Sequence, residues 1–303
     1  ETVEANATVI GHSKKWATVE WNGEEALCRT DHLVQERATT LLAPGDRVRV
    51  EVREDEPWII GIRPRKTRLS RLAIEHSKVQ EQVMAANIDV LVIMTTPVQP
   101  NFKPGLVDRF LISAQLGGVH PVIAMNKIDL VETPPAELDT YRELGITVLT
   151  ISCTDGIGID ELRKEIAGKT SVLAGQSGVG KTSLLNALDP KLDLATQTVS
   201  ASTDKGRHTT TSARLYHLDN GIDIIDTPGI RQLGLWKVTE AHLSYLFPEM
   251  AEIALACKFR NCTHTHEPDC AVAAAVEQGD ITSQRYRSYL RIREDLQERA
   301  ERR

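Results

Sequence analysis

The chain has 303 residues and a mass of 33.6 kDa, enough for two or three domains that each bury a core without disulfide bonds. Its net charge of -6 and pI near 5.9 argue against a surface that coats nucleic acid indiscriminately. Hydrophobic residues make up 41% of the sequence, but no apolar run approaches the roughly 18 residues of a membrane span, which excludes a membrane-spanning protein.

The first residues and the cysteines indicate the compartment. The chain does not open with a basic segment followed by an apolar one, so no secretory signal is predicted. It has five cysteines, and three of them crowd between Cys257 and Cys270, which suits a metal site better than a disulfide framework. We therefore expect a cytoplasmic protein.

Residues 1–66 are expected to form a small barrel. Apolar and polar residues alternate in 16–21 and in 47–53, as they do in half-buried strands. Turn signals at Asn22-Gly23 and at 44–46 separate about five such segments. This strand count matches an all-β barrel of the OB type, a fold that binds RNA in many proteins and is a spacer in others.

Two stretches are rich in basic residues. Residues 63–71, RPRKTRLSR, contain no acidic residue, and the tail from Arg285 onward is rich in arginine. Each stretch is either a contact for nucleic acid or a solvated face, and the sequence leaves both interpretations open.

Residues 67–235 have the pattern of an α/β domain, and residues 236–303 that of a helical segment. Apolar runs at 88–94, 119–125, 146–151, 171–174 and 222–225 alternate with helical patterns such as 106–116 and 136–144. This alternation indicates a mostly parallel sheet covered on both faces. After 236 no strand pattern remains, and a charged helix is expected from about Ser283.

Two short motifs follow strands of this domain in positions suited to a nucleotide base. Asn126, Lys127 and Asp129 lie in NKID, where the Asp129 carboxylate can accept from both N1–H and the exocyclic amine of guanine. Adenine offers neither donor, so this motif predicts selection of GTP over ATP. Ser152 and Cys153, after the strand pattern at 146–151, are expected to buttress the base.

A phosphate-binding loop follows the apolar run SVLA and precedes a helical pattern. Its glycines let backbone N–H groups point at phosphate oxygens, Lys181 can reach the β- and γ-phosphates, and the Thr182 hydroxyl can bind Mg²⁺. The expected nucleotide contacts are Gly175, Gln176, Ser177, Gly178, Val179, Gly180, Lys181, Thr182 and Ser183.

Two switch segments are expected. The first is 189–212, where Thr210 is the chosen Mg²⁺ ligand and Thr209 and Thr211 are close alternatives. The second is DTPG, in which Asp226 is placed near Mg²⁺ and the Gly229 N–H near the γ-phosphate.

One further group is needed to orient the attacking water. Ile230 follows DTPG, where Ras-like switches commonly carry a glutamine, and isoleucine cannot orient water. His208 is the candidate replacement because a neutral imidazole can accept from water. The alternative is that His208 packs or contacts RNA.

A metal site is expected in the C-terminal segment. Cys257, Cys262, His264 and Cys270 supply three thiolates and an imidazole, the number and softness of donors that a closed, structural Zn²⁺ site needs. His266 is the competing imidazole.

Together these motifs resemble the guanine-nucleotide elements of TRAFAC GTPases in a circularly permuted order, with the base motifs before the phosphate loop. The permutation is allowed because every motif lies at one edge of one sheet. With the barrel in front and the cysteine cluster behind, the whole chain resembles the ribosome small subunit-dependent GTPase A family of bacteria and plastids.

The resemblance implies a circularly permuted Ras-like P-loop GTPase domain between an OB-like barrel and a helical zinc-binding segment. It also implies a GTPase that uses GTP, Mg²⁺ and Zn²⁺, binds the 30S ribosomal subunit and its 16S rRNA, and acts in late small-subunit maturation; we expect a monomer. Two alternatives stay open: another P-loop NTPase, such as a nucleotide kinase, and an RNA-binding module that holds GTP as a structural ligand.

Overall fold

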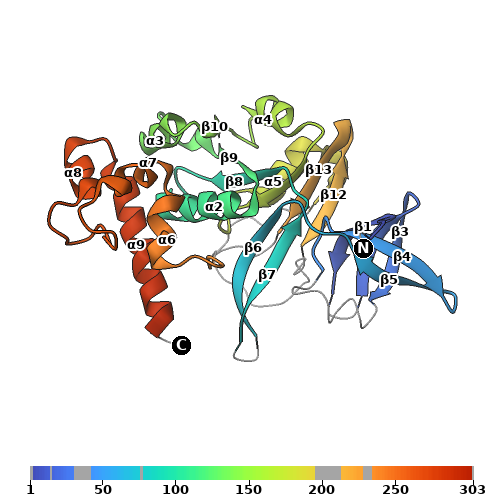
Figure 1. Cartoon of the computed structure of the whole chain (residues 1–303). Coiled ribbons are helices and arrows are strands. Elements are labelled where there is room, and N and C mark those ends of the chain that lie inside the picture. Colours follow the sequence, from blue (N-terminus) through green and yellow to red (C-terminus); the bar gives the residue numbers. More distant parts are fainter. Residues whose placement is uncertain are drawn as a thin grey trace, which may run out of the picture.

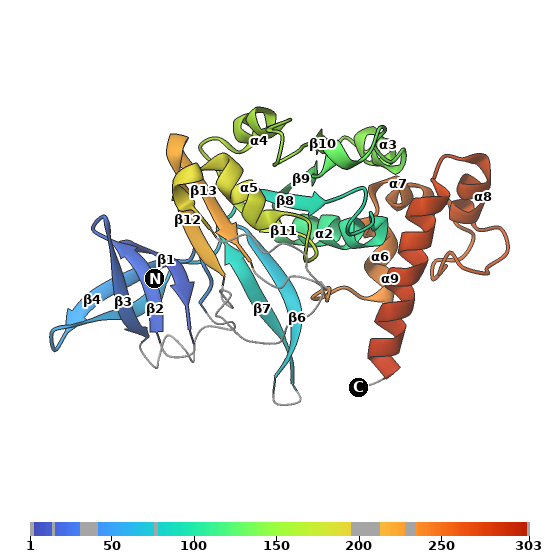
Figure 2. The same ribbon diagram turned by 180° about the vertical axis from the view of Figure 1, so that it is seen from behind.

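A computed structural model describes residues 3–13, 16–30, 42–75, 78–194, 213–227 and 234–301 (Figure 1). A barrel lies at one end of the molecule and a helical C-terminal segment at the other, with a mixed sheet between them (Figures 1 and 2). This arrangement follows the order of the predicted segments along the chain.

The barrel consists of five strands, as the alternation of apolar and polar residues predicted. They are β1 (Ala7–His12), β2 (Trp16–Trp21), β3 (Glu24–Thr30), β4 (Arg47–Arg53) and β5 (Glu56–Ile62). Their order is β1-β2-β3-β5-β4, and β4 pairs back with β1 to close the sheet. Val48 and Val50 are buried while Arg47 and Glu51 are exposed, because successive side chains of a strand point to opposite faces.

The central part of the sheet has five parallel strands and one antiparallel strand next to the barrel. Its members are β8 (Val90–Thr95), β9 (His120–Met125), β10 (Thr147–Thr150), β11 (Thr170–Ala174), β12 (Arg214–Leu218) and β13 (Ile222–Asp226). The order is β10-β9-β8-β11-β13-β12, and only β12 runs antiparallel to its neighbour.

Helices cover both faces of this sheet. The main ones are α2 (Pro104–Gly117), α3 (Glu137–Glu143), α4 (Ile159–Ile166) and α5 (Lys181–Leu188). Along β8, Leu91 and Ile93 join the core under α2 and α3, whereas Val90 and Val92 join the core under α4 and α5. A strand buried on both faces needs an unbroken apolar run, as β8 has. The helices on both faces of the sheet confirm the predicted α/β layering.

The strand β12 and a hairpin were not predicted from the sequence. β6 (Arg68–Glu75) and β7 (Lys78–Ala86) form a separate two-stranded sheet, which begins inside the stretch interpreted as basic. Two basic side chains of this stretch already have partners across the hairpin, because Arg68 pairs with Glu81 and Arg71 donates to Gln82. Polar cross-strand pairs of this kind stabilise a hairpin without an apolar pattern, so the signal was weak.

The C-terminal segment is helical, as predicted. It contains α6 (Glu240–Leu243), α7 (Pro248–Ala251), α8 (Ala271–Gln278) and α9 (Ser283–Glu301). Short 3₁₀ turns complete the described elements: η1 (Ile128–Leu130), η2 (Pro190–Leu192), η3 (Asp219–Gly221), η4 (Ser244–Leu246) and η5 (Ile253–Ala256).

The first arginine of the basic tail is not a solvated charge. Arg285 is 3% exposed and pairs with Asp108 of α2 and with Glu249 of α7. Although burial opposes the charge, Asp108 and Glu249 raise the pKa of Arg285, so the buried cation persists. This ion pair joins α9 to the helix layer of the central sheet.

The barrel is bonded directly to the central sheet. Gly11 of β1 pairs with Arg214 of β12, which merges the two sheets. Close by, Asn87 donates to the Gly45 carbonyl at 2.9 Å, and a Cβ on Gly45 would lie 2.0 Å from the Ala86 oxygen. Only glycine permits this approach between barrel and sheet.

Candidate functional site

The sequence motifs meet at one edge of the central sheet. β8, β9, β10, β11 and β13 are parallel, so their carboxyl ends lie on the same side. The loops that follow these strands carry Asn126, Ser152, Gly175 and Thr227. In open α/β sheets this is the edge where ligands bind.

The loop 175–180 is folded around its own lysine. Lys181 Nζ donates to the carbonyl oxygens of Gly175 at 2.9 Å and Gln176 at 3.2 Å. Gly175, Gly178 and Gly180 all have positive φ, at 150°, 82° and 96°. These conformations exclude most other residues, and the loop leads into the N-terminus of α5, where backbone N–H groups have no partner within the helix.

Asn126 ties the base loop to the phosphate loop. Its side chain is 2% exposed and donates from Nδ2 to the Val179 carbonyl at 2.9 Å, while Oδ1 accepts from the Cys153 N–H at 3.0 Å. A Cβ on Gly180 would lie 2.3 Å from Asn126 Nδ2. One amide therefore joins three loops that are far apart in the sequence.

The residues expected at the base lie beside Asn126. Asp129 is exposed in η1, so its carboxylate is open to a ligand. Ser152 is buried and accepts from the Asp155 N–H at 3.1 Å, which shapes the next turn. Burial, together with the charge of Asp129, raises the pKa of the Cys153 thiol to about 12, so this cysteine stays protonated and packs.

The loop between β8 and α2 was missed by the sequence analysis. The Gln99 carbonyl accepts from Lys127 Nζ, and the Asn101 carbonyl accepts from Gln176 Nε2 at 3.2 Å. This loop thus contacts both the base motif and the phosphate loop. Its only sequence signal was a proline-flanked turn after a strand, which identifies a loop and not a ligand site.

Asp226 and Thr182 offer oxygen ligands at the same edge. Oδ1 of Asp226 is buried without a hydrogen-bond partner among the described residues. Burial raises the pKa of Asp226, and the nearby Lys181 opposes that shift. A buried carboxylate oxygen without a donor among the described residues fits a hard cation such as Mg²⁺, and the Thr182 hydroxyl in the first turn of α5 is a second oxygen at this edge of the sheet.

Several predicted site residues cannot be placed. Thr210, His208 and Gly229, with the alternatives Thr209 and Thr211, lie outside the described residues. Their assignments rest on the sequence alone.

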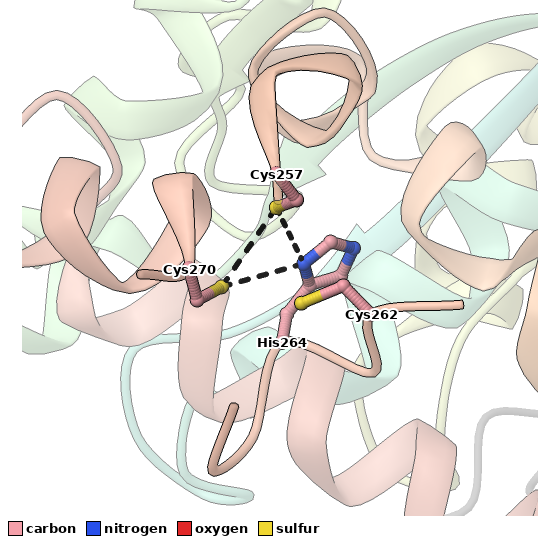
Figure 3. Close-up of side chains that lie close together, drawn as sticks. All are labelled: Cys257, Cys262, His264 and Cys270. Carbon is pink, nitrogen blue, oxygen red and sulfur yellow. Dashed lines mark hydrogen bonds between the residues drawn. The ribbon is translucent and has the colours of Figure 1, made fainter. Parts of the chain in front are cut away.

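The four predicted zinc ligands converge in the C-terminal segment (Figure 3). Their donor atoms all lie within 4.8 Å of one another. Cys257 Sγ is 3.5 Å from His264 Nδ1 and 3.9 Å from Cys270 Sγ, and Cys270 Sγ is 3.5 Å from the same nitrogen. Sulfur and nitrogen ligands of a tetrahedral Zn²⁺ stand roughly 3.5–3.8 Å apart, so the donor set and the separations among Cys257, His264 and Cys270 fit this ion.

Neighbouring residues hold this cluster in place. The hydroxyls of Tyr286 and Tyr289 on α9 donate to the carbonyls of His264 and Thr263 at 2.6 and 2.9 Å. His266, the competing imidazole, is exposed and contacts Thr265 Oγ1 instead. The cluster is thus attached to the helix whose Arg285 reaches the central domain.

Within the described ranges, no helix combines the length and the apolar character needed to cross a bilayer.

Comparisons with known proteins give consistent similarities. A family model described as RsgA GTPase matches residues 62–236. The chain is 40% identical over 264 residues to a protein named small ribosomal subunit biogenesis GTPase RsgA from Gemmatimonas aurantiaca, an alignment that covers 86% of each chain. A protein of the same name from Bacillus anthracis is 38% identical over 278 residues, 90% of each chain.

Two solved structures are similar over nearly the whole chain. YjeQ from Thermotoga maritima has a TM-score of 0.73 and 30% identity, covering 96% of this chain and 98% of that one. YloQ, described as a circularly permuted GTPase, has a TM-score of 0.68 and 29% identity, covering 98% and 96%.

Proposed function

This chain belongs to the RsgA GTPase family, and we propose on that premise that it hydrolyses GTP to GDP and phosphate in the biogenesis of the small ribosomal subunit. Its partners in this role are the 30S subunit and its 16S rRNA. A cytoplasmic location follows from that partner, and we expect the chain to act as a monomer.

One contact carries the proposal. Asn126 of the base motif donates to Val179 of the phosphate loop at 2.9 Å, so the groups assigned to the two ends of a guanine nucleotide are hydrogen-bonded to each other. A kinase would need an additional site for a phosphoryl acceptor, and NKID would serve no purpose with adenine.

The base and phosphates are assigned to separate groups of residues. Asp129 accepts from the guanine ring and its amine, with Lys127, Ser152 and Cys153 around it. The N–H groups of 175–183 surround the phosphates, and the ammonium of Lys181 exchanges its present carbonyl partners for phosphate oxygens. Since Lys181 already lies inside the loop, little rearrangement is required.

Hydrolysis itself needs a positioned water and stabilisation of developing charge. Water attacks the γ-phosphorus as the bond to the β-phosphate oxygen breaks. Lys181 stabilises charge on the phosphoryl oxygens, the Gly229 N–H contacts the γ-phosphate, and His208 orients the water. Because Ile230 cannot orient water, intrinsic turnover is expected near the unassisted range of about 10⁻⁴ to 10⁻² per second, with acceleration by the 30S subunit.

Thr182, Thr210 and Asp226 are the residues proposed to hold Mg²⁺. The buried, unpaired Oδ1 of Asp226 supports this assignment. When bound, the ion supplies positive charge beside the β- and γ-phosphates.

Cys257, Cys262, His264 and Cys270 are proposed to hold a structural Zn²⁺. Four protein ligands leave no open position for substrate, so the ion supplies folding energy to its segment and no chemistry.

The test is the GTPase rate of the purified chain alone, with 30S subunits and with 50S subunits. We expect acceleration by 30S subunits only. Turnover of ATP in the presence of a phosphoryl acceptor would favour the kinase alternative. Binding of GTP without hydrolysis, even with 30S subunits, would favour the RNA-binding module.

A further inference from the structure

Three side chains from three neighbouring strands form a row on the outer face of the barrel. Trp16 of β2 pairs with Arg29 of β3, and Arg29 pairs with Trp58 of β5. The next residues along β2 and β5, Ala17 and Ile59, are 0% exposed in the barrel core. Strand alternation therefore turns the row outward.

The row is in close contact and open to solvent. Arg29 Cζ lies 5.0 Å from the ring centroid of Trp16 and 5.6 Å from that of Trp58. The Arg29 side chain is 44% exposed, and both indole rings are half-buried. Leu27, on the same side of β3, is 57% exposed. The face thus presents two indole rings, a leucine and, between the rings, a guanidinium group that contacts both.

The position and chemistry of the row suit one class of ligand. In OB barrels the face of the second and third strands is where oligonucleotides lie. Indole and guanidinium planes stack on any unpaired base, because every base has a π-face. Base-paired RNA hides these faces, so the ligand must be single-stranded.

The charges around the row limit how RNA can be held there. Arg29 already pairs with Glu56 at 2.9 Å. Glu20 and Glu25 lie opposite each other further along β2 and β3. Acidic side chains repel a phosphate backbone. Stacking must therefore supply most of the affinity for RNA, and the release of counterions from the phosphates contributes little.

We propose that Trp16, Arg29 and Trp58 form a stacking platform for unpaired bases of the small-subunit RNA. The identity of the RNA rests on the proposed function, whereas the stacking chemistry rests on the barrel. The platform assigns single-strand recognition to these three residues, and not to the basic stretch at 63–71.

The test uses the full-length protein with two probes: an oligouridylate of about ten nucleotides, within the site sizes of OB folds, and purified 30S subunits. The variants are Trp16→Leu, Trp58→Leu and Trp16→Phe. The control is Val52→Ala, an exposed position on β4 that lies outside the row. Binding is measured by tryptophan fluorescence for the oligonucleotide and by co-sedimentation for the subunit, across a range of salt concentrations.

We expect each leucine variant to bind oligouridylate about 5- to 100-fold more weakly, while Trp16→Phe retains most of the affinity and Val52→Ala all of it. The plot of log K against log salt concentration is expected to have a slope of about -1 or shallower, since at most one phosphate contact is made. Rescue by phenylalanine also excludes a general folding defect.

Three results would overturn the platform. One is unchanged affinity of both leucine variants for both probes. Another is a slope of about -3 or steeper that the leucine variants share, because backbone charge would then dominate. The third combines two observations: the wild-type protein does not bind oligouridylate, yet the leucine variants bind 30S subunits more weakly. This result would assign the face to contact with a ribosomal protein. Failure of wild-type protein to respond to 30S subunits, with oligonucleotide stacking intact, would instead contradict the proposed function.

Discussion

The nucleotide edge and the Cys/His cluster are assembled in opposite ways. At the nucleotide edge, Asn126 contacts a residue 53 positions away, and Gln176 contacts one 75 positions away. The cluster draws all its donors from 257–270. Parallel strand ends hold the first site, whereas loop backbone and two tyrosines of α9 hold the second.

This difference predicts how each site responds to a substitution or to loss of its ligand. When a lost group contacts the nucleotide and no other loop, loops fixed by a buried sheet keep their geometry, so such changes act on binding and turnover alone. Without an ion the cysteines are protonated thiols, and the loop loses the bonds that join its four ligands, so loss of the ion acts on local folding. The following predictions test this separation.

The largest effect is expected from Lys181→Ala. The loop keeps its glycine conformations, but the charge on the phosphoryl oxygens loses its stabilising cation, so turnover falls on the order of 10³-fold or more. Single-turnover GTP hydrolysis measures the loss, with circular dichroism as the check of folding. Normal turnover in the folded variant would contradict the phosphate-loop assignment.

Asp129→Asn is expected to reverse base preference. The amide cannot accept from both guanine donors, and GTP affinity falls about 10²-fold or more because two charge-assisted hydrogen bonds are lost. The amide can donate to the 2-oxo group of xanthine, so xanthosine triphosphate binds better to the variant than GTP does. Competition between the two nucleotides gives the result, and retained GTP preference would remove Asp129 from the base site.

His208→Ala tests the water-orienting group. We expect turnover stimulated by 30S subunits to fall about 10- to 100-fold, while GTP affinity stays the same, because the imidazole acts only in the transition state. Stimulated turnover at the wild-type rate would leave water positioning to backbone groups or to the ribosome.

Asn126→Ala tests whether the edge behaves as one unit. Two buried hydrogen bonds between loops are lost, and GTP affinity is expected to fall about tenfold. Asn101→Ala is the matched control, since Asn101 contacts Gln176 through its main-chain carbonyl and the substitution preserves it. Equal affinities of the two variants, measured by calorimetry, would show that the loops are held independently.

The smallest effect on the nucleotide is expected from loss of zinc. Chelation, or Cys262→Ala, should raise hydrogen exchange across 257–270 while GTP affinity changes less than about threefold, because the cluster shares no ligand with the nucleotide edge. Elemental analysis of protein purified without chelator is the direct check. Absence of bound metal, or loss of GTP binding after chelation, would contradict the separation of the two sites.

The sequence by itself determined the features that depend on local spacing. The GQSGVGKT loop requires particular glycines next to a lysine, and the alternation of Val48 and Val50 with charged residues requires a strand. Both are set by backbone conformation over a few residues. The order of the motifs along the chain also sufficed to predict the permuted fold.

The tertiary structure decided what depends on residues far apart. It gave Asn126 its linking role, brought the Gln99 and Asn101 carbonyls to the site, and buried Arg285 between Asp108 and Glu249. The residues next to a side chain in the sequence do not indicate which distant residue it contacts in the folded chain. For the same reason, Trp16, Arg29 and Trp58 read as scattered residues until three strands placed them in one row.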